Sequence, residues 1–192
     1  MRGLFFLSAV AVLIGTVAIG ACPDITDDSI NDTTVEGSPF GADFTDSTAG
    51  HKVVSDGAAG STVVRIAPRP DVCAAVLDPA DEVDPSLIIV IKGTQPQTYQ
   101  VVPLDYAGPP GGGAPPPTAT VTLLTHTSSC DAGVEDASGV SCAINRGAAS
   151  GELVLDSLVD GQLATGAFAF DFPEGGGTVT GSFHAPACMS IR

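Results

Sequence analysis

The spacing of the apolar residues limits the possible folds more than any other feature of this chain. After residue 46 the sequence consists of short apolar and β-branched runs separated by Gly, Pro, Asp and Ser. No window of a dozen residues keeps apolar positions at helical spacing, and only residues 71–78 could wind into a helical turn. Strands are predicted over 51–55, 61–67, 86–92, 98–104, 118–126, 152–158, 163–172 and 178–185. We therefore expect one all-β domain over 47–192, an antiparallel β-sandwich or flattened barrel of about eight strands.

The clearest alternation lies in the last forty residues. Phe168, Phe170 and Phe172 share one face of the strand predicted over 163–172, which places them in the core. Asp160-Gly161 suits a two-residue hairpin turn, because both central residues of a type I′ turn need positive φ. The domain should therefore end in a three-stranded meander.

Other segments predict local features. Gly166 and Gly181 lie inside predicted strands and indicate either a bulge or a place where a neighbouring side chain needs room. The continuous apolar run 87–91 predicts a strand in a central position, buried on both faces or between sheets. Residues 107–117 are rich in Gly and Pro and cannot pair as a strand, so we expect a flexible loop there.

The first 21 residues have the pattern of an export signal. Arg2 is followed by an apolar stretch over 4–19 that is too short for a stable membrane span. The stretch ends in Ile19-Gly20-Ala21-Cys22, which resembles the lipobox of bacterial lipoproteins. The resemblance implies cleavage after Ala21 and acylation of Cys22, with a thioether-linked diacylglycerol and an amide-linked acyl chain. The mature protein would then be anchored to a membrane of the cell envelope without spanning it.

Residues 22–46 are expected to form the lipidated N-terminus and a flexible acidic tether. From 23 to 46 the chain carries seven acids and no base, and its few apolar residues follow neither helical nor strand spacing. Pro23 and Asp24 directly follow the lipobox cysteine, and we expect the outer membrane rather than the inner one.

The net charge excludes one class of partner. The chain has 22 acidic and 7 basic residues, and the signal contains only Arg2 among them, so the mature chain has a formal charge of −16. A surface without a basic patch does not favour nucleic acid or anionic lipid headgroups. We expect no nucleic-acid partner and a membrane contact made through the lipid anchor, with an envelope protein or a glycan as the possible partner of the domain.

Four cysteines remain once Cys22 is assigned to the lipid. An even number in an exported protein predicts two disulfides, and four cysteines allow three pairings. We favour Cys130 with Cys142, which share one loop, and Cys73 with Cys188, which would clip the final strand to the early part of the domain. A zinc site would need closely spaced cysteine pairs, and the sequence has none.

The sequence carries no catalytic signature. Its three histidines, His51, His126 and His184, are scattered, and no nucleophile elbow, zinc-protease motif or phosphate-binding glycine loop occurs. We therefore expect a non-enzymatic structural or interaction module without a cofactor. A glycan-binding or calcium-binding module with Asp-rich loops is the alternative. The calcium candidates are four closely spaced carboxylates, for which a solvated turn is the simpler interpretation: Asp78, Asp81, Glu82 and Asp84.

One further resemblance concerns the C-terminal part. Residues 150–155 and 178–188, including Gly181-Ser182-Phe183-His184-Ala185 before Cys188, resemble the final meander of small β-rich lipoproteins of the myxobacterial type. In that group a Gly-Thr/Ser-Phe-x-Ala segment precedes the last cysteine. The resemblance implies an envelope location and a β fold, and it implies no activity.

Overall fold

The computed structural model describes residues 33–54, 60–77, 85–109, 116–127, 142–159 and 161–188. These residues are almost entirely β-structure, as the sequence predicts. They form β1 (Thr34–Glu36), the single-turn 3-10 helix η2 (Pro39–Gly41), β2 (Thr48–Val54), β3 (Ser61–Ala67), α1 (Cys73–Leu77), β4 (Ser86–Ile91), β5 (Gln97–Val101), β6 (Thr118–Thr127), β7 (Cys142–Gly147), β8 (Ser150–Val159), β9 (Leu163–Phe172) and β10 (Gly177–Pro186). The helical turn expected within 71–78 is present as α1.

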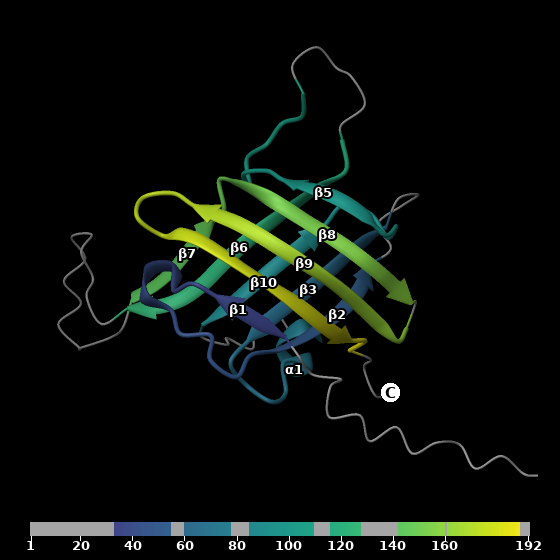
Figure 1. The fold of residues 1–192 in the computed structure, drawn as a ribbon, viewed down its shortest axis with the longest axis horizontal. Coiled ribbons are helices and arrows are strands. Elements are labelled where there is room, and N and C mark those ends of the chain that lie inside the picture. Colours follow the sequence, from purple (N-terminus) through teal and green to yellow (C-terminus); the bar gives the residue numbers. More distant parts are fainter. Residues whose placement is uncertain are drawn as a thin grey trace, which may run out of the picture.

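The ten strands of the described residues belong to one curled sheet. Its order is β1-β10-β9-β8-β5-β6-β4-β3-β2, and β7 pairs with β6 off this path. In Figure 1, β8, β9 and β10 pass in front of β2, β3 and β6. Buried side chains from both parts of the sheet form a single core cluster, so the curled sheet encloses its own core.

The expectation of a purely antiparallel sheet is wrong at one place. β5 and β6 pair in parallel, with Gln100 opposite Thr118 and Val101 opposite Ala119. Two parallel neighbours need a crossover connection, and the chain between β5 and β6 contains the Gly/Pro-rich stretch expected as a loop. The sheet is therefore mixed.

The C-terminal meander is confirmed. β8, β9 and β10 pair in chain order and antiparallel, and Phe168, Phe170 and Phe172 are all buried. The backbone N–H of Gln162 donates to the Val159 carbonyl at 3.0 Å, which closes a two-residue hairpin turn containing Gly161.

The two strand glycines make room for aromatic rings. Gly166 lies opposite Phe183, and Gly181 lies opposite Phe168. A Cβ atom built on either glycine would lie 2.7 Å from the Cζ atom of the facing phenylalanine. The need for room is confirmed at both glycines, and a register shift also occurs opposite Gly166, between Leu155 and Ser157 of β8.

β4 occupies the centre of its half of the sheet, between β3 and β6. Leu87, Ile89 and Ile91 are fully buried in the core, whereas Ile88 and Val90 on the other face are half-buried. The central position expected from the apolar run is confirmed, and full burial is limited to one face.

The tether expected over 22–46 is too long. From Thr33 onward the chain belongs to the folded domain, because β1 pairs with β10 and Phe44 is only 4% exposed in the main core. The apolar residues of this stretch are isolated, so they show no periodicity, and their burial depends on strands more than a hundred residues away. Residues 22–32 lie outside the described part of the chain.

Candidate functional site

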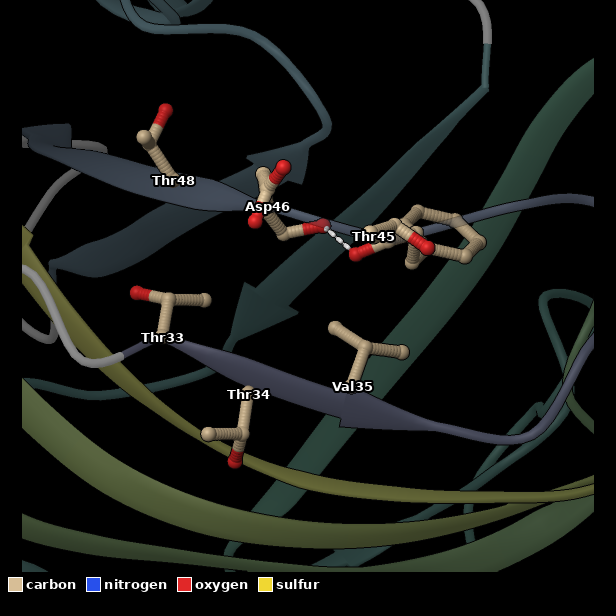
Figure 2. Close-up of a pocket in the computed structure, with 8 residues that line it drawn as sticks. Thr33, Thr34, Val35, Thr45, Asp46 and Thr48 are labelled. Atoms are coloured by element: carbon tan, nitrogen blue, oxygen red, sulfur yellow. Dashed lines mark hydrogen bonds between the residues drawn. The ribbon is translucent and has the colours of Figure 1, made fainter.

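An open groove lies between β1 and the segment that leads into β2. Its volume is about 480 Å³, and it is lined by Thr33, Thr34, Val35, Phe44, Thr45, Asp46, Ser47 and Thr48. β1 and β2 are the two end strands of the sheet, so the groove opens between the sheet's ends. Figure 2 shows Thr33 and Val35 pointing from β1 toward the segment of Asp46, and Thr34 pointing to the opposite side.

Most hydroxyl protons in the groove are already engaged. Ser47 donates to the Phe44 carbonyl at 2.5 Å, Thr45 donates to an Asp43 carboxylate oxygen at 2.6 Å, and Thr48 donates to the Arg69 carbonyl. Each of these hydroxyl oxygens can still accept a hydrogen bond. The spare capacity of these three groups is therefore that of acceptors.

Asp46 adds a charged acceptor. Its side chain is exposed, and its backbone has a φ of +54°, a left-handed conformation that Asp tolerates better than most residues. Its carboxylate forms no hydrogen bond or ion pair with the described residues. The groove can therefore accept hydrogen bonds from a ligand rich in N–H and O–H groups.

Asp43 supports the groove from outside it. The Thr45 hydroxyl and then the Thr45 backbone N–H donate to its carboxylate, and they lower the pKa of Asp43 below its ordinary value of 3.8. The ionised side chain thus fixes the turn that presents Asp46.

A second polar cluster joins the end of β10 to β2. His51 is 1% exposed, and its Nδ1 lies 2.7 Å from the Ala185 carbonyl. The expected disulfide between Cys73 and Cys188 is confirmed. In the described part of the chain, these chemically versatile side chains make structural contacts.

The other two histidines lie in strands. His184 is half-buried on β10, and its backbone N–H donates to the Thr33 hydroxyl at 3.3 Å. His126 lies in β6 opposite Ala143. No group of three or more His, Cys, Asp or Glu side chains that could hold a metal ion occurs among the described residues.

Several predicted site residues lie outside the described ranges: Cys22, Asp78, Asp81, Glu82, Asp84 and Cys130. The pairing of Cys130 with Cys142 therefore stays a prediction, although Cys142 is placed as the first residue of β7. The calcium site at 78–84 also stays a prediction.

Sequence reasoning missed the groove because six of its eight lining residues belong to the segment assigned to the tether. The available signal was the pair Phe40 and Phe44, two large apolar side chains in an otherwise polar stretch. No helix of the described residues is long and apolar enough to cross a membrane. The chain matches no protein-family model, no curated protein and no solved structure in the comparisons made.

Proposed function

We propose that this protein is a lipid-anchored module of a bacterial cell envelope that acts through structural or binding contacts rather than catalysis. The observation that carries the proposal is the lipobox Ile19-Gly20-Ala21-Cys22, with only ten residues between Cys22 and Thr33, the first residue of the described fold. An export signal, an acylation site and a β domain follow one another in the order that an anchored envelope module requires.

The short connection limits how far the domain can stand from the lipid. The eleven residue steps from Cys22 to Thr33 span at most about 40 Å when fully extended. A flexible chain of this length has a root-mean-square reach of about 17–20 Å. The groove includes Thr33 itself, so an anchored domain would hold the groove close to the membrane surface.

The roles of the reactive side chains support binding rather than catalysis. His51 is buried against a backbone carbonyl, and Cys73 and Cys188 are joined to each other. In the groove the hydroxyl groups of Thr45, Ser47 and Thr48 donate to acceptors other than Asp46, so none of them is paired with that carboxylate as a nucleophile with its base. We further infer that the curled sheet is a flattened barrel, because β10 contacts both end strands, β1 and β2.

Fatty-acid labelling tests the anchor. Cells expressing the full-length protein would be fed an alkyne fatty acid, and the labelled protein would be detected after click chemistry. We expect strong labelling of the wild type and of the control Cys130→Ser, and no labelling of Cys22→Ser. Equal labelling of Cys22→Ser and wild type would refute lipidation at Cys22.

Glycan binding is the second candidate function, favoured by the spare acceptors of the groove. A hydroxyl-rich or amine-bearing sugar supplies the donors that Asp46, Ser47 and Thr48 can accept. Titration with amino-sugar oligomers, followed by amide chemical shifts, should perturb residues 33–35 and 44–48. Asp46→Asn should weaken the binding, whereas Asp71→Asn, an exposed carboxylate outside the groove, should not. Unchanged binding by Asp46→Asn would refute this use of the groove.

Calcium binding by the carboxylates at 78–84 is tested separately. If Asp78, Asp81, Glu82 and Asp84 form a calcium site, calcium in low-salt buffer should raise the melting temperature. The combined replacement of these four residues by Asn or Gln should abolish the rise. A melting temperature that calcium leaves unchanged would refute the site.

A further inference from the structure

The contact between the end of β10 and β2 is the smallest strand contact among the described residues. Neighbouring strands in this part of the chain pair over two residues, as β5 and β6 do, or more, as β2 and β3 do along seven. β10 and β2 share one isolated parallel bridge, His51 with Ala187. We call this contact, formed by His51 on one side and residues 185–188 on the other, the seam.

Two hydrogen bonds join His51 to residues 185–188. The backbone N–H of Cys188 donates to the His51 carbonyl at 2.8 Å, and His51 Nδ1 lies 2.7 Å from the Ala185 carbonyl. Cys188 also carries the disulfide to Cys73, the first residue of α1. The covalent bond and both hydrogen bonds therefore converge on the same few residues.

The disulfide packs directly against β2 at Gly50. A Cβ atom on Gly50 would lie 2.6 Å from the Sγ of Cys188 and 3.3 Å from the Sγ of Cys73. Only a residue without a side chain lets the disulfide lie directly on this strand. Val72 and Val76, both 3% exposed, complete the cover over this part of the sheet.

The two cysteine residues differ in exposure. Cys188 is 7% exposed, whereas Cys73 is half-buried at the start of α1. We therefore take Cys73 as the residue at which a thiolate from solvent approaches the bond, because which sulfur is attacked depends on access.

We propose that the Cys73–Cys188 disulfide is a redox-controlled latch, and that a dithiol reductant opens the seam while the rest of the sheet stays folded. One reductant thiolate attacks Cys73 Sγ, the Cys73–Cys188 bond breaks, and Cys188 leaves as a thiolate and is protonated. The second reductant thiol then displaces Cys73 from the mixed disulfide. The protein gains two electrons and two protons, and the dithiol becomes a disulfide.

Opening the seam changes which strand edge of the domain is exposed. β2 pairs with β3 along one edge, and its other edge faces the end of β10. Release of residues 185–188 frees the backbone of β2 around His51 and so lengthens its unpaired edge, which can pair with another strand. This inference is independent of the lipid anchor, because it rests only on described residues of the β domain.

Hydrogen exchange measured by mass spectrometry tests the latch. The mature protein with Cys130→Ser and Cys142→Ser would be folded in the oxidised state, so that Cys73–Cys188 is the one reducible bond, and then compared with and without dithiothreitol. We expect peptides covering 48–54 and 184–188 to exchange at least tenfold faster after reduction. Peptides covering Ser86–Ile91 and Leu163–Phe172 should stay protected over the same exchange times.

A second variant distinguishes the effect of losing the disulfide from other effects of dithiothreitol. Adding Cys73→Ser and Cys188→Ser to the same background should reproduce the fast exchange at the seam without dithiothreitol. If this variant fails to fold, the comparison of hydrogen exchange before and after reduction of the oxidatively folded protein still tests the proposal. Three results would overturn the proposal: unchanged exchange at the seam, loss of protection in all peptides together, or a disulfide that dithiothreitol cannot reduce in the folded protein.

Discussion

Replacing Phe44 by Ala tests whether the segment from Thr33 to Asp46 belongs to the folded domain. Phe44 is 4% exposed and lies in the main core cluster with Ala42 and Ala49. Truncating a buried phenylalanine to alanine costs about 3–5 kcal/mol through lost burial and the cavity that remains. The side chain also borders the open groove, and water can enter the vacated space, so we expect about 3 kcal/mol.

Urea denaturation followed by circular dichroism measures this loss. With a slope of about 2 kcal/mol per molar urea, the midpoint should fall by about 1.5 M at an unchanged slope. Val159→Ala is the matched control, because Val159 is 45% exposed, and its loss should stay within about 0.5 kcal/mol. A Phe44→Ala protein as stable as the control would refute the inclusion of this segment in the cooperative core.

Three further perturbations test other parts of the fold. Gly181→Val places a side chain against the Thr34 carbonyl and the Phe168 ring, and it should cost about 1–3 kcal/mol and make the β1 segment sensitive to limited proteolysis; protease resistance equal to wild type would contradict the packing. Tyr99→Phe removes the hydroxyl that donates to the Gln95 carbonyl at 2.7 Å and should cost about 1 kcal/mol in urea denaturation, so an unchanged midpoint would speak against that bond. Because the pKa of Asp43 is lowered in the folded state, its stabilising contribution is complete above pH 3.8 and is lost as the pH falls through the folded-state pKa. An NMR titration should show the Thr45 amide shifting below pH 3.8 in the wild type and not in Asp43→Asn; a midpoint at or above 3.8 would contradict the hydrogen bonds.

The local sequence pattern was sufficient to predict a strand and its buried face where apolar residues alternate along that strand. Phe168, Phe170 and Phe172 repeat every second residue, so their burial and the C-terminal meander could be predicted. The pairing of Cys73 with Cys188 could also be selected, because one cysteine closely follows an early strand and the other follows the last.

The parts of the fold that the sequence pattern did not predict depend on partners far away in the chain. β1 is a three-residue strand with one half-buried side chain, and only its pairing with β10 makes it a strand. β7 contains Asn145 and Arg146, both exposed, and joins the sheet through β6. The parallel contact of β5 with β6 is set by where the chain returns after the Gly/Pro-rich stretch. No local pattern contains this information, and the groove between the sheet's ends was missed for the same reason.

The intact mass of the protein extracted from membranes tests the central claim most directly. Top-down mass spectrometry should find a chain that begins at Cys22 and carries the mass of a diacylglycerol group, with or without an amide-linked acyl chain, on that residue. A chain that begins at Cys22 without lipid, or one that begins at another residue, would contradict the account of a lipid-anchored envelope module.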